Sequence, residues 1–333
     1  MYDVITVGSS TIDVFAGVES ELIKIKTAHH EEDLIAYPSG SKILIKDLTF
    51  LTGGGGTNTA VACSKLGLKT AYLGKMGKGS NSNLIIKNLR KEKVDFIGTR
   101  TNKFHAGYSV ILDSLDNDRT ILTYKGANNE LSFKEINLKK IKAKWFYFSS
   151  MVGKSYLALE DLAEYASKKK IKIAFNPSNY LAVKGEPFLR KLLSSTYLLV
   201  LNMEEACLIA GKLQIQELIL KLQGYGPKIV VVTDGKNGAF TIHGNKLLHV
   251  IPSKIKAKET TGAGDAFAST FMAGLIKGKD VETSLKMGIR NAESVICNMG
   301  AKNGLLKYRV LLDRIRKNPP KIEKKTVASN KHF

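Results

Sequence analysis

The stretch Thr260-Thr261-Gly262-Ala263-Gly264-Asp265 decides the fold, because it joins a glycine turn to the apolar run from Ala266 to Leu275. The apolar run predicts a buried helix, and the first N–H groups of a helix have no partner within it. Aligned peptide dipoles place about half a positive charge at such an end. We therefore expect the amides of Gly262, Ala263 and Gly264 to bind a phosphoryl group and Asp265 to act as a base beside it. An aspartate at this position also commonly caps a helix, and that alternative stays open.

A second glycine turn, Gly53 to Gly56, leads into a small-residue helix predicted over residues 57–66. Four glycines leave little side-chain bulk, which suits a polyol or sugar held against backbone groups. The amide of Asn58 can donate and accept hydrogen bonds at once. A flexible loop is the alternative. The turn is neither a Walker loop nor a Gly-x-Gly-x-x-Gly nucleotide fingerprint.

Three further polar turns follow predicted strands, at the strand ends where α/β folds collect ligands. Gly8 to Asp13 places Asp13 just past the strand 4–7. Asn202 and Glu205 follow the strand 197–201 and are candidates for a hydrated Mg²⁺, although a glutamate there also caps a helix. Residues 233–238 close the strand 229–233 and equally fit an ordinary tight connection.

Apolar runs alternate with helical patterns along the chain, which predicts α/β layering around a mostly parallel sheet. The segments that carry this prediction are strands at 4–7, 144–148, 171–175, 197–201 and 229–233, and helices at 57–66, 81–91, 156–168, 204–211, 215–222 and 266–275.

Two stretches, 33–52 and 105–124, break the alternation, because they contain runs rich in β-branched residues and no helix. The runs are Lys42 to Lys46 and Tyr108 to Leu112, and the second pairs with 119–123 through an Asp116-Asn117-Asp118 turn to predict a hairpin. Together they predict a small sheet that projects from the main body. From Asn318 onward apolar residues are few, which predicts a disordered tail.

Length and charge exclude several classes of protein. The 333 residues bury a substantial core without disulfides, and no apolar run approaches the length of a bilayer span. The start of the chain lacks the features of a secretory signal, so we predict a cytoplasmic protein. We expect Cys63, Cys207 and Cys297 to be buried thiols. The net charge of +21 is compatible with nucleic-acid binding, but the arginines are scattered and no binding motif is present, so a solvated lysine-rich surface is favoured.

The five motifs, in this order and spacing, resemble the ribokinase-like carbohydrate kinases, also called the phosphofructokinase B family, over about residues 1–316. The motif that ends in Gly262-Ala263-Gly264-Asp265 is the specific one, and the motif at Gly53 to Gly56 is moderately specific. The resemblance implies a doubly wound, mostly parallel α/β body flanked by helices, with a β-sheet lid from segments near 14–50 and 105–125, and a basic tail over 317–333. It also implies ATP- and Mg²⁺-dependent phosphorylation of a hydroxyl on a sugar or a nucleoside.

The resemblance assigns roles to residues. Asp265 looks like the base, and Gly262, Ala263 and Gly264 like the anion hole. The positions that match substrate contacts are Thr11, Asp13, Gly53, Gly54 and Asn58. The positions that match the nucleotide side are Asn202, Glu205, Thr233, Gly235, Gly238 and Asn291, with Glu205 reaching Mg²⁺ through water.

This chain departs from the family pattern at two positions. Glu259 stands where many relatives have Asp near a monovalent-cation site, which leaves potassium activation open. Gly55 replaces the Lys of ribose-specific members.

Other readings of the sequence remain. They are a nucleoside kinase of the same fold, a non-catalytic sugar-binding or regulatory member, a nucleic-acid-binding protein, and a nicotinamide-dependent dehydrogenase, which would need a glycine fingerprint that the segment 8–13 lacks. We expect specificity to depend on lid residues, with Tyr108, Val110 and Tyr124 as candidates. Exposed lid edges also make a homodimer plausible.

Overall fold

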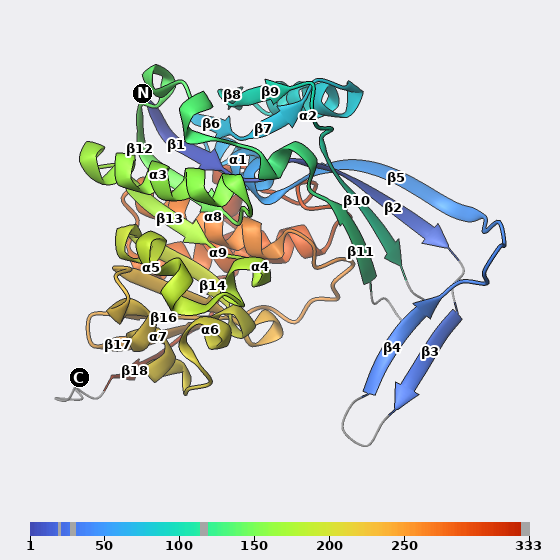
Figure 1. Cartoon of the computed structure of the whole chain (residues 1–333). Helices are drawn as coiled ribbons and strands as arrows, with labels where there is room; N and C mark the ends of the chain where they lie inside the picture. Colours follow the sequence, from blue (N-terminus) through green and yellow to red (C-terminus); the bar gives the residue numbers. More distant parts are fainter. Residues whose placement is uncertain (19–20, 27–30, 114–118, 328–333) are drawn as a thin grey trace.

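A computed structural model describes residues 1–18, 21–26, 31–113 and 119–327, and its centre is a large sheet (Figure 1). Within these ranges the sheet has ten strands, seven of which, from β15 to β8, run parallel. Three antiparallel strands complete one edge. In spatial order the strands are β18 (Ile322–Thr326), β17 (Lys246–Val250), β16 (Ala239–His243), β15 (Ile229–Thr233), β14 (Leu198–Asn202), β13 (Lys172–Asn176), β12 (Ala143–Ser149), β1 (Tyr2–Val7), β6 (Thr70–Leu73) and β8 (Asp95–Phe96).

Helices cover both faces of the sheet, since parallel strands need crossover connections that bury both of its sides. One face carries α3 (Lys154–Lys169), α5 (Gly185–Ser195), α6 (Met203–Ala210) and α7 (Ile215–Gly224). The other face carries α1 (Gly55–Lys65), α8 (Ala263–Ile276), α9 (Val281–Ile296) and α10 (Tyr308–Lys317). The remaining helices are α2 (Ser80–Lys91), α4 (Asn179–Ala182), and the short 3₁₀ turns η1 (Gly126–Asn129), η2 (Phe133–Glu135), η3 (Leu138–Lys140) and η4 (Gly235–Asn237).

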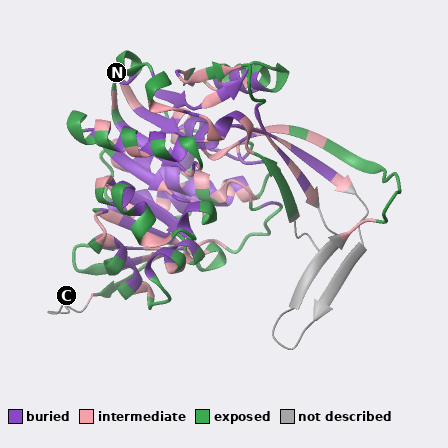
Figure 2. Cartoon of the chain, in the orientation of Figure 1, coloured by how far each residue is buried: buried purple, intermediate pink, exposed green. Residues whose placement is uncertain are grey.

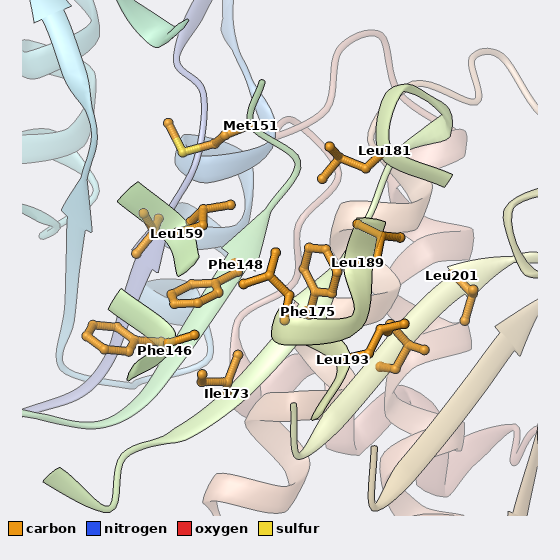
Figure 3. Close-up of a cluster of buried hydrophobic side chains, with 14 of the residues drawn as sticks. Phe146, Phe148, Met151, Leu159, Ile173, Phe175, Leu181, Leu189, Leu193 and Leu201 are labelled. Atoms are coloured by element: carbon orange, nitrogen blue, oxygen red, sulfur yellow. The ribbon is translucent and has the colours of Figure 1, made fainter. Parts of the chain in front are cut away.

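Alternation of side chains along each strand builds a separate core on each face. In β12, Phe146 and Phe148 point toward α3 and α5, while Trp145 and Tyr147 belong to the core under α8 and α9. Figure 3 shows the first of these cores, where Phe148 and Phe175 lie among leucines of the covering helices. Figure 2 shows the buried residues concentrated in this layered body. The predicted doubly wound body is confirmed.

A second, four-stranded sheet projects from the body (Figure 1). Its strands lie in the order β11 (Arg119–Tyr124), β10 (Gly107–Asp113), β2 (Thr11–Val18) and β5 (Ile45–Gly53). The predicted hairpin is β10–β11 in antiparallel register, and β2 pairs parallel with β10 and antiparallel with β5. Two smaller pairings are β3 (Glu21–Lys26) with β4 (Glu31–Ala36), and β7 (Lys75–Gly77) with β9 (Thr99–Thr101).

The structure corrects several sequence expectations. Lys42 to Leu44 are not in a strand, because β5 begins only at Ile45 and continues to Gly53. The described part of the tail expected to be disordered instead forms β18, whose backbone pairs antiparallel with β17 along all five residues while only Ile322 is partly buried. Of the three thiols expected to be buried, Cys63 is buried, Cys207 is half-buried and Cys297 is exposed. The predicted turn at 116–118 and residues 328–333 of the tail lie outside the described residues.

No helix in the described ranges is both long enough and apolar enough to span a bilayer.

Candidate active site

The glycine turn before α8 has a backbone that only glycine adopts readily. Gly262 is the N-cap residue with φ of 82°, in the left-handed region. A side chain at this position would also collide with Ala301, in the loop after α9. At Gly264, by contrast, an added Cβ meets no atom of the described residues within 4 Å. The start of α8 therefore keeps open space beside Gly264, as an anion hole requires, whereas the Ala263 amide donates to the Thr260 carbonyl at 3.2 Å.

Asp265 lies in the first turn of α8 and is linked to α1. Nδ2 of Asn58 donates a hydrogen bond of 2.9 Å to Oδ2 of Asp265. Burial raises the pKa of Asp265 to about 6, the hydrogen bond and the charge of Lys302 act in the opposite direction, and the Asp13 carboxylate adds to the rise. A carboxylate with such a pKa is still ionised at neutral pH and is a better proton acceptor than an ordinary aspartate.

Asn58 sits on α1, where α1 packs against α8. Its side chain is buried, and its Oδ1 has no hydrogen-bond partner among the described residues. A buried amide oxygen without a partner is costly, and a ligand hydroxyl would satisfy it. The predicted substrate positions Asn58, Thr11, Asp13, Gly53 and Gly54 do not themselves line the cleft beside Asp265, so their contact with a substrate stays a prediction.

Asp13 differs from its predicted setting, because it lies inside strand β2 and not in a loop after β1. Oγ1 of Thr11 donates 2.7 Å to Oδ1 of Asp13, so these two predicted residues are in contact. The carboxyl group rests on Gly53, where a side chain would collide with it. Burial raises the pKa of Asp13 and is the largest influence on it. Hydrogen bonds from Thr11 and Ser109 and the charge of Lys302 lower this pKa in part.

Sequence reasoning missed Lys302, in the loop between α9 and α10. Its Nζ donates to Oγ1 of Thr52 at 3.1 Å and to Oγ1 of Thr57 at 3.0 Å. Burial lowers the pKa of Lys302 to about 7, and the carboxylates of Asp13 and Asp265 act against that shift. The only signal for it in the sequence is its place directly after the Gly300-Ala301 turn, which does not distinguish it from many other lysines.

A cleft of about 240 Å³ opens beside Asp265. It lies at the carboxyl ends of β12 and β13, between the base of the small sheet and α4. Most of its lining residues are of polar types, although apolar atoms make up the larger part of the lining surface. The residues are Ser9, Gly55, Lys125, Asn128, Asn129, Ser149, Ser150, Met151, Val152, Asn176, Ser178, Tyr180 and Asp265. Of these, only Asp265 and Gly55 were singled out in the sequence. The turns 125–129 and 176–179 each follow a predicted strand, so strand-end polarity was the signal that would have found most of the others.

Asn202 and Glu205 form a reciprocal capping box at the start of α6. Oδ1 of Asn202 accepts from the Glu205 amide at 2.8 Å, and Oε2 of Glu205 accepts from the Asn202 amide at 2.9 Å. The capping role that the sequence left open is thus real. Burial raises the pKa of Glu205 to about 7, with repulsion from Glu204 and Asp265 adding to the rise. Glu205 and Asp265 are therefore close enough to interact.

Within the described ranges, no three His, Cys, Asp or Glu side chains lie close enough together to coordinate a metal ion by themselves. Mg²⁺ in phosphoryl-transfer sites is usually held by substrate phosphates, waters and one or two carboxylates. Glu205 fits such a role, since it is a buried carboxylate near Asp265.

The other predicted nucleotide positions separate into two groups. Thr233 ends β15 directly beside Asn202 at the end of β14, so those two lie together. Both Gly235 and Gly238 have a positive φ, of 47° and 93°. An added Cβ at Gly235 meets no described atom within 4 Å, whereas one at Gly238 would collide with the Val250 carbonyl.

Asn291 does not face a ligand site. It is completely buried in α9, where its Nδ2 donates 2.7 Å to Oγ1 of Thr270 and its Oδ1 accepts 2.9 Å from the Leu306 amide. The predicted place of Asn291 on the nucleotide side is wrong, because both polar groups of this amide are used to tie α9 to α8 and to the segment before α10.

The two departures from the family pattern also have local explanations. Oε2 of Glu259 accepts 2.6 Å from the Gly300 amide, so this buried carboxylate holds the loop that carries Lys302. An added Cβ at Gly55 would lie 2.5 Å from Oγ of Ser149 and 3.5 Å from Oδ1 of Asp265. A lysine at position 55 would thus collide with Ser149. Lys302, in another loop, supplies a positive charge that acts on the carboxylates of Asp13 and Asp265.

This doubly wound fold, with a small projecting sheet and a carboxylate at a glycine-lined helix start, defines the ribokinase-like class. The family model described as pfkB family carbohydrate kinase matches residues 10–307. The chain therefore belongs to the pfkB family of carbohydrate kinases.

Individual relatives are distant but cover most of the chain. A protein of Archaeoglobus fulgidus named "Uncharacterized sugar kinase" is 27% identical over 249 residues, covering 73% of this chain and 97% of that protein. Ribokinase of Bacillus subtilis is 26% identical over 272 residues, with 80% and 88% covered. The structure of Arabidopsis thaliana ribokinase complexed with ribose and ATP is similar with a TM-score of 0.79 at 22% identity, and covers 94% of this chain and 98% of that one.

Proposed function

We propose that this protein is an ATP-dependent kinase that transfers the γ-phosphate to a hydroxyl group of a sugar or sugar-like acceptor. The observation that carries the proposal is the hydrogen bond between Asn58 and Asp265, which joins the two glycine-turn helices at the edge of one polar cleft. Membership of the pfkB family of carbohydrate kinases supports the same reaction class.

The residues of this site suit phosphoryl transfer, which asks a protein mainly for alignment and charge neutralisation. In the proposed step, the acceptor hydroxyl oxygen forms a bond to the γ-phosphorus while the bond from that phosphorus to the β,γ-bridging oxygen breaks and ADP leaves. Asp265 takes the hydroxyl proton. The amides of Gly262 and Gly264 hold the transferring group, joined by that of Ala263 once it exchanges its bond to the Thr260 carbonyl for the ligand, and Oδ1 of Asn58 accepts from the acceptor.

ATP and Mg²⁺ would lie on the side of the site formed by β14, β15 and the start of α6. Asn202, Thr233 and Gly235 are the nucleotide residues in this proposal, with Glu205 as the carboxylate that orders hydrated Mg²⁺. Mg²⁺ bound there would neutralise phosphate charge. The similar fold of a ribokinase solved with ATP supports this nucleotide.

A sugar fits the cleft better than a nucleoside does. The lining beside Asp265 is dominated by serine and asparagine side chains, which suit hydroxyl groups. A nucleoside kinase would need an apolar slot for the base. Tyr180 is the only aromatic side chain among the described residues that line the cleft. Its ring is already in a cation–π contact with the ammonium group of Lys125.

The experiment is acceptor-dependent ADP release in a coupled assay over pentoses, hexoses, sugar acids, sugar phosphates and nucleosides. We expect at least one sugar or sugar derivative to release ADP well above the acceptor-free rate. The Asn58→Ala variant should lose at least about tenfold in kcat/KM, since it removes a buried hydrogen-bonding side chain. Asn245→Ala, at an exposed turn, is the matched control. Binding of acceptors without any ADP release would point to the non-catalytic alternative and contradict the proposal.

A homodimer through the small sheet belongs to the same proposal. Leu48, Phe50 and Leu122, in its two outer strands, are each at least half exposed, which is unusual for large apolar side chains. We expect sedimentation to give a dimer that Leu122→Lys weakens. A wild-type monomer at micromolar concentration would contradict this part.

A further inference from the structure

The cleft beside Asp265 contains a cation that the proposed chemistry does not use. Among the described residues that line it, Lys125 is the only basic one and Asp265 the only acidic one. The other polar groups of the lining are neutral hydroxyls and amides. A lysine in such a place therefore calls for its own explanation.

Lys125 is held in the cleft and is not a solvated surface lysine. It follows β11 and is partly buried, and its Nζ lies 4.3 Å from the centre of the Tyr180 ring. Burial lowers the pKa of its ammonium group, and no carboxylate offsets that effect. No ion pair joins Lys125 to an acidic side chain in the part of the chain that the structure describes. Burying an unpaired charge is unfavourable, and a contact with an aromatic ring compensates only in part.

The backbone around Lys125 is firmly anchored. The next residues form η1, where Nδ2 of Asn128 donates 2.9 Å to the Ser10 carbonyl and Oδ1 of Asn128 accepts 2.9 Å from the Ser10 amide. The Ala127 amide also bonds to the His105 carbonyl at 2.9 Å. Lys125 is thus positioned at the rigid base of the small sheet, where β2 leaves the body, so its ammonium group is preorganised for a ligand.

Lys125 shares its cleft with Asp265, the proposed base, which has to contact the acceptor hydroxyl. The position of Asp265 is therefore what connects this cleft with the acceptor. The predicted substrate positions Thr11, Asp13, Gly53, Gly54 and Asn58 do not line it, and neither do the nucleotide-side residues Asn202, Thr233 and Gly235.

We propose that the acceptor carries an anionic group, either the carboxylate of a sugar acid or the phosphate of a sugar phosphate, and that Lys125 binds this group in the cleft beside Asp265. This inference rests on the proposed kinase function. The anion neutralises the charge of Lys125, while the serine hydroxyls and the side chains of Asn129 and Asn176 bind the hydroxyls of the same molecule.

The test compares acceptors of one carbon skeleton with and without a charge: fructose with fructose 6-phosphate, and glucose with gluconate and 2-keto-3-deoxygluconate. We expect kcat/KM for at least one charged acceptor to exceed that for its neutral counterpart by about tenfold or more. Lys125→Met should raise the KM for that acceptor about 10- to 100-fold, because a charge-assisted contact is lost. It should leave the KM for ATP unchanged, and Lys125→Arg should restore most of the affinity. Lys134→Met, at an exposed position in η2, is the matched control.

The outcomes separate the inference from the function on which it rests. Sugar acids and sugar phosphates distinguish the two sources of the anion. Better use of neutral sugars or nucleosides, equal losses in Lys125→Met and Lys134→Met, or a rise only in the KM for ATP would each overturn the inference and leave the kinase intact. If no acceptor releases ADP, the proposed function fails. Calorimetric binding of the same charged compounds, present in wild type and lost in Lys125→Met, would then still support an anionic ligand, and its absence would refute one.

Discussion

The two glycine turns look alike in sequence, but the structure gives them different surroundings. In the turn before α1, an added Cβ at Gly54 or Gly56 would lie 2.6 to 2.8 Å from the backbone of residues 8–10 or from the Tyr72 ring. In the turn before α8, Gly262 is confined by Ala301, but Gly264 faces open space. In the first turn Gly54 and Gly56 are thus enclosed by the protein itself, although Gly55 between them lines the cleft, and in the second turn Gly264 has room beside it.

This difference teaches that glycine has two uses at a helix start. Before α1 it allows strand β1, the start of β2 and the helix to approach closely, so that Asn58 reaches Asp265. Before α8 it leaves N–H groups uncovered for a ligand. The sequence pattern reports the glycines, but only the packed neighbours distinguish the two uses.

The largest effect that follows from this comparison is on stability, in the α1 turn. Gly56→Ala should lower Tm by about 1–4 °C, because its methyl group meets the Gly8 backbone and the Tyr72 ring and overpacking of this kind costs about 1–3 kcal/mol. Thermal unfolding followed by circular dichroism measures it. A Tm equal to that of wild type would mean that the turn is not tightly enclosed.

The matched substitution in the α8 turn should act on catalysis instead. Gly264→Ala places a methyl group in open space at a helical position where alanine is favourable, so Tm should stay the same or rise slightly. Turnover should fall about tenfold, since a small misplacement of the phosphoryl group is costly. Full activity in this variant would show that no ligand uses the open space.

A smaller effect concerns the pH dependence of Asp265. The pKa of Asp265 is raised to about 6, and only the ionised form accepts a proton, so kcat/KM should fall as the pH decreases through about 6. The charge of Lys302 lowers this pKa, and Lys302→Met therefore should move the acidic limb to higher pH by about 0.5–1 unit. Lys302→Arg keeps the charge and should leave the limb where it is in wild type. If the acidic limb of kcat/KM lies at the same pH in Lys302→Met as in wild type, the charge of Lys302 does not influence the pKa of Asp265.

The sequence predicts the layered body well, because the alternation of apolar runs and helical patterns is strong where strands are buried on both faces. It predicts the small sheet less well, since β5 is mostly exposed and lacks a clean apolar alternation. β18 was missed for a similar reason, because an edge strand with exposed lysines has the composition of a solvated tail.

The candidate site was predictable where a residue lies within a motif. Asp265 and Asn58 are in this category, and their hydrogen bond joins residues 207 positions apart. Lys302 and Lys125 were not predictable from the sequence. A lysine in a loop gives no local sign that the fold will bury it near a carboxylate or in a cleft. Asn291 shows the opposite error, in which a polar residue near a motif serves packing.

The central claim, that Asp265 is the base of a phosphoryl transfer, is tested most directly by the turnover of Asp265→Asn. With the acceptor found in the coupled assay, kcat should fall at least about a hundredfold, because a positioned base contributes about 10² to 10⁴ in rate. The Kd for ATP should stay within about twofold of wild type. Tm should be unchanged or higher, since the variant removes a charge whose pKa is raised by burial. A folded Asp265→Asn protein that retains a near-normal kcat would contradict the account.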